Sequence, residues 1–69
     1  MNKYIIPICD IDSETIKLER VSAVSIQDCK DELMDRYNDY SSALEWDEFV
    51  DDMRNDNFII GDITDIEEL

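Results

Sequence analysis

The sequence predicts a small α+β domain of order β-β-α-α-β, with a mostly antiparallel three-stranded sheet packed against an antiparallel helical hairpin. Three observations lead to this prediction. Strand-forming residues alternate in two runs near the N-terminus and in one near the C-terminus, and between them apolar residues recur every three or four positions. The 69 residues, 43% of them apolar, form one domain (residues 1–69) near the lower size limit for independent folding.

The first strand is expected over residues 3–11, KYIIPICDI, which carry apolar side chains at positions of both parities. Pro7 lacks a backbone donor, which places this strand at a sheet edge or puts a bulge in it. Helices cover one face of a two-layer sheet, so the other face would hold the apolar side chains left over. If these form a patch, a homodimer would cover it; the candidates are Tyr4, Ile5, Ile6, Cys9 and Ile60.

The second strand is expected over residues 15–24, joined to the first as an antiparallel hairpin by the turn residues 10–14, DIDSE. Apolar side chains alternate cleanly up to Leu18, and the alternation then slips by one residue before Val21. A slip of one residue moves side chains to the opposite face of a strand. We therefore expect an irregularity near Glu19–Arg20.

The first helix follows directly and begins at a favourable N-cap, Ser25, with Asp28 three residues later as an approximate capping box. Its apolar residues recur at spacings of 3, 4, 4 and 3, the pattern of one helical face. These stripe residues are Ile26, Cys29, Leu33, Tyr37 and Tyr40.

A second helix is expected after a capping box at Ser42, and a connection of about three residues predicts an antiparallel hairpin. Residues 55–57 form a helix-ending turn. The third strand covers residues 58–66, where Gly61 marks a bulge or a close backbone approach, and residues 67–69 form a short acidic tail. The core face of the second helix comprises Trp46, Phe49, Val50 and Met53.

Charge is the most unusual property of the chain, with 19 Asp and Glu against 6 Lys and Arg and a formal net charge of −13. Lys30 and Arg36 fall at the borders of the first apolar stripe, where their stems cover core edges. The acids opposite the stripes are left largely unpaired, and like charges four residues apart cost a few tenths of a kcal/mol per pair. The outward acids are Asp28, Asp31, Glu32, Asp35, Asp39, Asp47, Glu48, Asp51 and Asp52.

Several functions find no support in the sequence. There is no His, Cys9 and Cys29 are too far apart for a C-x-x-C motif, and no catalytic motif is present, so we expect neither an enzyme nor a cofactor or metal site. In the calcium-loop frame that starts at Asp10, Thr15 stands where an EF-hand has Gly. Six basic residues neutralise too few phosphates for direct binding to nucleic acid or anionic lipid.

No signal peptide and no apolar run long enough to span a bilayer are found, so we expect a cytoplasmic protein with reduced thiols. The leading explanation of the acids is a basic protein partner, since charges about 5–6 Å apart on a helix can occupy a groove that binds nucleic acid. Two alternatives stay open. The acids are only solubilising, in a homodimeric structural or accessory protein, or the chain is an antitoxin-like partner of a basic toxin.

The chain resembles the small acidic proteins of bacteriophages and other mobile elements, among them DNA mimics of the anti-CRISPR and anti-restriction types. The segments KYIIPICDID and FIIGDITDIEEL are similar to the ends of small phage proteins. The resemblance is one of class: a short, His-free, strongly acidic α+β domain. It implies an inhibitor of a host-defence nuclease, such as a Cas effector or a restriction enzyme, in the host cytoplasm. No functional motif transfers residue by residue, so the nine outward acids are expected to bind that partner on the ground of their charge and helical spacing alone.

Overall fold

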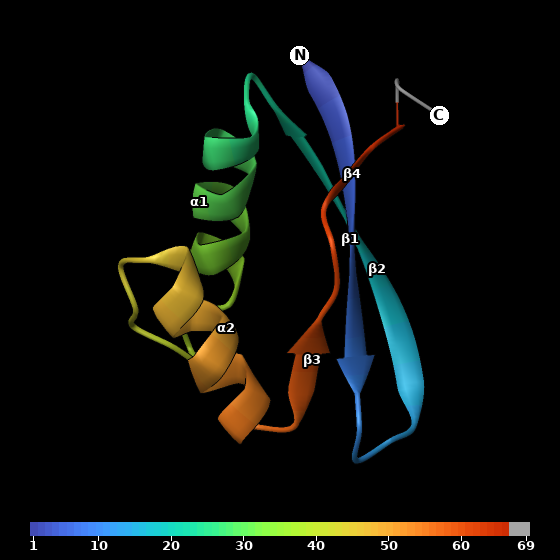
Figure 1. Ribbon diagram of the computed structural model, residues 1–69, viewed down its shortest axis with the longest axis vertical. Coiled ribbons are helices and arrows are strands. Elements are labelled where there is room, and N and C mark those ends of the chain that lie inside the picture. The colour runs from blue at the N-terminus through green and yellow to red at the C-terminus, as the bar shows by residue number, and fades with distance from the viewer. Residues whose placement is uncertain (67–69) are drawn as a thin grey trace.

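The computed structural model describes residues 1–66, in which an antiparallel sheet carries two helices on one face (Figure 1). The elements are β1 (Asn2–Asp10), β2 (Thr15–Ala23), α1 (Ile26–Arg36), α2 (Trp46–Asn55), β3 (Phe58–Ile60) and β4 (Thr64–Asp65). The α+β class and the order of elements are confirmed, with the third expected strand divided into β3 and β4. The acidic tail expected at residues 67–69 lies outside the described residues.

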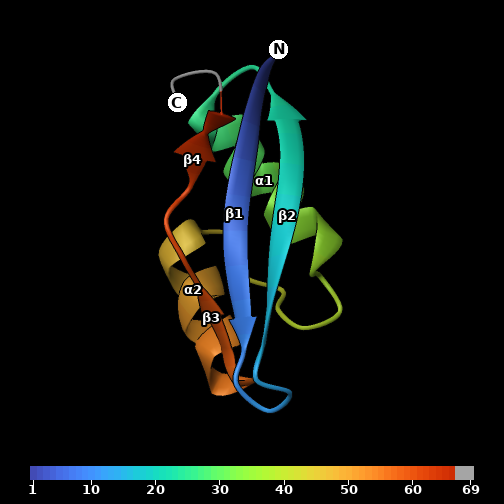
Figure 2. The ribbon, with the colours of Figure 1, turned by 90° about the vertical axis from the view of Figure 1, so that its right-hand side faces the viewer.

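The sheet is built around β1, with β2 on one side and both β3 and β4 on the other (Figure 2). β1 and β2 pair without interruption over all nine residues of each strand, so the irregularity expected near Glu19–Arg20 is wrong. The slip in the apolar pattern has another cause. Leu18 points away from the helices and is 54% exposed, whereas Val21 points into the core and is 2% exposed. The strand is regular and has apolar residues on both faces.

Pro7 lies in the central strand, so the edge position expected for it is wrong, and the irregularity occurs in the neighbouring strand instead. Residues 6–7 of β1 lie opposite residues 61–63, which places one extra residue between β3 and β4. The N–H of Gly61 donates to the carbonyl of Pro7 at 2.8 Å, on the side where Pro7 offers no donor. A Cβ at Gly61 would lie 2.6 Å from Cγ of Pro7, so the bulge and the close approach expected at Gly61 are both confirmed.

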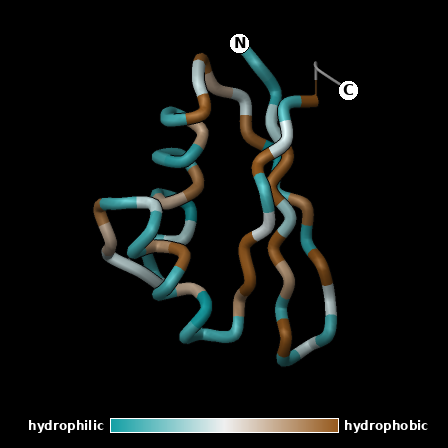
Figure 3. The backbone as a smooth tube through the Cα atoms, viewed as in Figure 1, coloured by the Kyte–Doolittle hydropathy of each residue, from teal (hydrophilic) through white to brown (hydrophobic). Residues whose placement is uncertain are grey.

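The core lies between the helices and the facing side of the sheet. Its residues follow both periodicities, with every second residue from the strands and every third or fourth from the helices. Figure 3 shows the same pattern, with hydrophobic and hydrophilic residues interchanging along α1 and α2. The buried apolar residues are Tyr4, Ile6, Ile8, Val21, Ala23, Cys29, Leu33, Phe49 and Met53.

The helices differ from the expected hairpin in connection and direction. Nine residues, 37–45, separate α1 from α2, and both helices descend in Figure 1. The reason lies in the sheet: β2 and β3 both run antiparallel to β1, and each helix folds back over the strand it adjoins, α1 over β2 and α2 over β3. The two helices therefore run in the same direction, which a three-residue link cannot allow.

The helix ends follow local capping rules, with one exception. Ser25 caps α1 as expected, its hydroxyl accepting from the N–H of Asp28 at 3.2 Å. The capping box expected at Ser42 is wrong, because Glu45 is the N-cap residue of α2 and makes no side-chain cap hydrogen bond. The turn after α2 is confirmed, with Asn57 in the left-handed region at φ 67°. Within residues 1–66 neither helix has the length and apolar character needed to cross a bilayer.

Candidate functional site

The nine acids predicted to bind a partner all lie exposed in the helical layer of the molecule. Four belong to α1, one follows it in the connection, and four belong to α2, and we call this surface the acidic face. Its α1 and connection residues are Asp28, Asp31, Glu32, Asp35 and Asp39; its α2 residues are Asp47, Glu48, Asp51 and Asp52. The helical spacing places these acids opposite the buried stripe of each helix.

Three residues of the acidic face have local partners. Glu32 forms an ion pair with Arg36 at 3.5 Å, Asp31 accepts from Gln27 at 3.2 Å, and Asp52 accepts from the Ser41 hydroxyl at 2.7 Å. The side chains of the other six have no hydrogen bond or ion pair with any part of the chain that the structure describes. Because six of the nine carboxylates have no local partner, and the exposed Glu32–Arg36 pair is weak, most of the negative charge of the acidic face is available to a partner.

The helices carry three basic residues, Lys30, Arg36 and Arg54, and within residues 1–66 only Arg36 forms an ion pair with the acidic face, through Glu32. Lys30 lies over the ring of Trp46, with its Nζ 5.6 Å from the ring centroid. Arg36 reaches across to β2, where it contacts Glu19 and donates to the carbonyl of Arg20 at 2.9 Å. Both positions at the borders of the apolar stripe agree with the sequence pattern.

An open groove of about 780 Å³ runs along one flank of the acidic face, between α2, the first turn of α1 and the β3–β4 connection. Its apolar lining includes half-buried Trp46 and Val50, and two residues of the acidic face, Asp47 and Asp51, lie beside them. Asp62 adds a third carboxylate from the other wall, and Lys30, whose Nζ lies over the Trp46 ring, adds one cation to the lining. An apolar groove with carboxylates along it suits a side chain that has an apolar stem and a cationic end.

Sequence reasoning did not find this groove, because its walls come from segments that are distant in the chain. The one sequence feature that indicates the groove is Val50, an apolar residue at the edge of the α2 stripe, between Trp46 and the outward acids. That Ile60 and Asp62 form the facing wall follows only from the pairing of β3 with β1. Trp46, expected in the core, is half-buried against Phe49 with ring centroids 5.4 Å apart.

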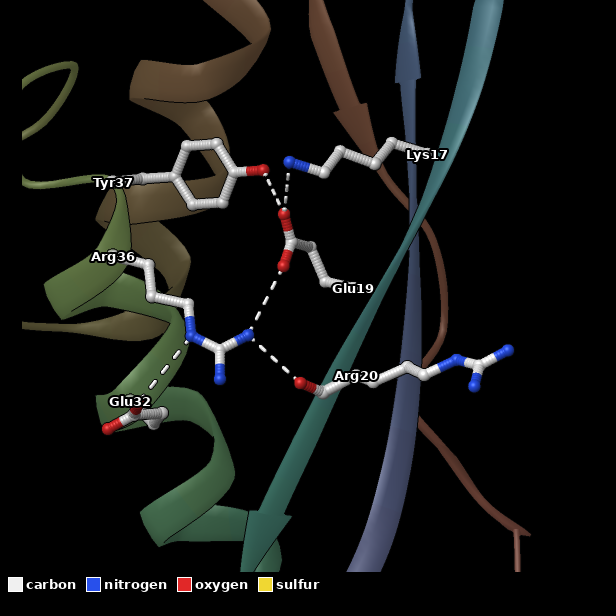
Figure 4. A network of polar contacts seen from close by, with 6 residues as sticks. All are labelled: Lys17, Glu19, Arg20, Glu32, Arg36 and Tyr37. Carbon is white, nitrogen blue, oxygen red and sulfur yellow. Dashed lines mark hydrogen bonds and ion pairs between the residues drawn. The ribbon is translucent and has the colours of Figure 1, made fainter.

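A second polar cluster lies between α1 and β2, centred on the buried carboxylate of Glu19 (Figure 4). One carboxylate oxygen accepts from the Tyr37 hydroxyl at 2.6 Å and lies 3.0 Å from Nζ of Lys17. The other oxygen accepts from Nη1 of Arg36 at 3.2 Å. With three donors on two oxygens, this carboxylate is satisfied within the described fold.

The electrostatics of this cluster follow from those contacts. Burial alone would raise the pKa of Glu19, but hydrogen bonds from Tyr37, Lys17 and Arg36 outweigh it and hold the pKa below its usual value. Burial and the adjacent Glu19 carboxylate raise the pKa of Tyr37. The cluster ties α1 to β2 and is directed inward, so we assign it to stability and leave partner binding to the acidic face.

Comparisons with known proteins identify no relative of this chain. No family model, curated protein or solved structure matches this chain. Among residues 1–66 no group of three metal-ligating side chains converges. The acidic face and the adjoining groove are therefore the surfaces of this chain whose chemistry suits a binding partner.

Proposed function

We propose that this protein binds a basic nucleic-acid-binding protein through its acidic face and occupies the site that nucleic acid uses. In this proposal it is a phage-type inhibitor, and its target is a host-defence nuclease such as a Cas effector or a restriction enzyme. The observation that carries the proposal is the set of six outward carboxylates without local partners, five of them on two neighbouring helices and one in the connection between the helices. Stability alone gives no reason to keep like charges at this spacing.

The spacing of the charges supports mimicry of a phosphate backbone. Outward acids one turn apart, such as Asp31 and Asp35, are separated by roughly 5–6 Å. Duplex DNA carries one charge per 3.4 Å of axis along each strand, so the match is loose but within the reach of flexible Arg and Lys side chains. Such a surface gains fast, electrostatically steered association with a basic cleft.

The groove supplies what charge alone lacks, a place for an anchoring side chain. Interfaces depend on a few residues that fill desolvated pockets, and Arg is common among them. An Arg stem from the partner would lie against Val50, beside the Trp46 ring that Lys30 already covers, while its guanidinium faces Asp47 and Asp51. The proposal also places the protein in the host cytoplasm, a compartment in which free thiols such as those of Cys9 and Cys29 persist.

The test is affinity capture from bacterial host lysate with and without nuclease treatment. A variant with Asp28, Asp35 and Asp47 changed to Lys should lose the captured partner. A control with Asp12, Glu14 and Asp56 changed to Lys alters the net charge equally, away from the acidic face, and should retain it.

We expect capture of one basic nucleic-acid-binding protein that added DNA or RNA displaces, with affinity falling roughly tenfold or more between ~50 and ~500 mM salt. Equal capture by both charge variants would contradict the proposal. Recovery of a small basic toxin that nucleic acid does not displace would assign the antitoxin-like function instead.

A further inference from the structure

The sheet face that points away from the helices is apolar and bare. The helices cover one face only (Figures 1 and 2), and every second strand residue therefore points outward from the other. Two of these side chains, Ile16 and Leu18, are 70% and 54% exposed. We call this surface the outer sheet face, and its apolar residues are Ile5, Pro7, Cys9, Ile16, Leu18 and Ile59.

Register makes these residues one continuous patch across three strands. Pro7 lies opposite Leu18, and Cys9 lies between Ile16 on β2 and Ile59 on β3. β1 and β2 contribute some seven residues each and β3 contributes three, and with strands about 4.8 Å apart this gives a flat apolar area of about 250–300 Å². A patch of a few hundred Å² is comparable to the largest apolar patch on many monomers, and such patches often take part in binding.

The charges on the outer sheet face are the reverse of those on the acidic face. No acidic strand residue within the described part of the chain shares the parity of this surface. Lys3 and Arg20 do share it, and both lie toward the end of the sheet away from the β1–β2 turn. A chain of net charge −13 thus has one broad face that another acidic protein can approach.

We propose that two copies of this chain pack their outer sheet faces together as a homodimer. Face-to-face packing places the sheets ~10 Å apart and leaves the acidic faces on opposite outer sides, at their greatest separation. In an antiparallel stack the basic end of each copy meets the β1–β2 turn of the other. Arg20 then faces Glu14 of the partner subunit, and Glu14 is exposed at that turn.

The exposed edge of β2 is a weaker candidate for self-association. Arg36 donates to the carbonyl of Arg20 at 2.9 Å and so occupies an acceptor on that edge. Lys17 and Glu19 form an ion pair along the same strand. Pairing through the edge would break these contacts, whereas packing through the outer sheet face leaves them in place.

The area sets the expected strength of the dimer. Two such patches with their polar margins bury about 700–1,000 Å² in total, which is in the range of weak, transient interfaces. Repulsion between two strongly acidic chains weakens the association further. We therefore expect dissociation in the micromolar range.

Sedimentation equilibrium from about 1 to about 100 μM tests the proposal at the concentrations that the area implies. The wild-type chain should change from monomer to dimer over this range, and Leu18→Lys should remain a monomer. Ile26→Lys is the matched control, because Ile26 is 50% exposed but lies on α1, and it should dimerise like the wild type. Circular dichroism verifies that each variant is folded. A wild-type monomer at ~100 μM, or a Leu18→Lys dimer, would overturn the proposal.

Salt dependence separates this dimer from binding through the acidic face. Screening reduces repulsion between the two chains, so the dissociation constant of the dimer should fall about tenfold between ~50 and ~500 mM salt. Partner binding through the acidic face weakens over the same range, so the two proposals can fail independently. A dimer that weakens as salt rises would contradict packing through the outer sheet face.

A charge exchange tests the antiparallel arrangement. Arg20→Glu places an acid opposite Glu14 of the partner subunit and should weaken the dimer about tenfold. Combining it with Glu14→Arg restores opposite charges in both symmetric contacts and should recover most of the affinity. Failure of the double variant to recover would exclude this orientation.

Discussion

Removal of one hydroxyl, in Tyr37→Phe, tests how the sheet holds the first helix. The variant loses the 2.6 Å hydrogen bond to Glu19 and leaves the carboxylate with Lys17 and Arg36. The ring stays, so its packing against Tyr40 and Phe49 is retained and no cavity opens. The change in stability therefore reports the hydrogen bond and not the packing.

The size of the expected stability loss follows from the charge of Glu19 and the exposure of its other two partners. A hydrogen bond to a charged group contributes about 1.5–3 kcal/mol, and partial exposure of Arg36 and Lys17 favours the lower half of that range. We expect Tyr37→Phe to lower the free energy of unfolding by about 2 kcal/mol at neutral pH. For a domain of this size that corresponds to a fall in Tm of roughly 8–16 °C.

The pH dependence has a definite sign. The folded pKa of Glu19 lies below its ordinary value of 4.5, so the carboxylate stabilises the fold above about that pH. This contribution is lost as the pH falls through the folded pKa, where Glu19 becomes neutral. The difference between wild type and Tyr37→Phe should therefore shrink below about 1 kcal/mol in acid.

Urea unfolding at neutral and acid pH measures both differences, and a double-mutant cycle with Glu19→Gln isolates the pairwise energy. We expect a coupling of about 1 kcal/mol between the two positions at neutral pH. A loss under about 0.5 kcal/mol at neutral pH, or the same loss at both pH values, would refute the assignment of Glu19 as the carboxylate that joins α1 to β2.

Two further predictions concern the sheet. Gly61→Ala should destabilise the fold by roughly 1–3 kcal/mol in thermal unfolding, because its Cβ would collide with the ring of Pro7; adding Pro7→Ala should recover part of the loss, and a neutral Gly61→Ala would contradict the close approach. In the native protein, Cys9 should react with a thiol reagent well before Cys29, since Cys29 is fully buried and burial raises its pKa. The Cys9→Ser variant should leave one slow thiol, and a fast phase that persists in it would show that the buried position is accessible.

Elements defined by short-range signals could be predicted from the sequence. The Ser25 cap and the stripe through Cys29 and Leu33 are local features, and they determine where α1 begins and which face it buries. The outward position of the acids follows from the same periodicity. The Ser42–Glu45 pattern did not locate the start of α2. Ser42 lies in the connection, and the helix begins after Glu45, three residues later.

Features that join distant segments could not be predicted in this way. The slip between Leu18 and Val21 fits either a bulge or a regular strand with two apolar faces, and only the continuous pairing with β1 decides between them. The contacts of Glu19 with Arg36 and Tyr37 span 17 and 18 residues. The groove beside Trp46 likewise needs β3 to be placed before its second wall exists.

By itself the sequence determined that this chain is a small, strongly acidic α+β domain whose two helices turn carboxylates toward solvent. Periodicity is sufficient for that conclusion, because it depends on residues three or four positions apart. Only the tertiary structure decided that the two helices run in the same direction across the sheet, and that Ile16 and Leu18 are among the residues exposed on the uncovered face. The way helices lie on a sheet depends on which distant strands pair, and the local spacing of apolar residues does not determine that pairing.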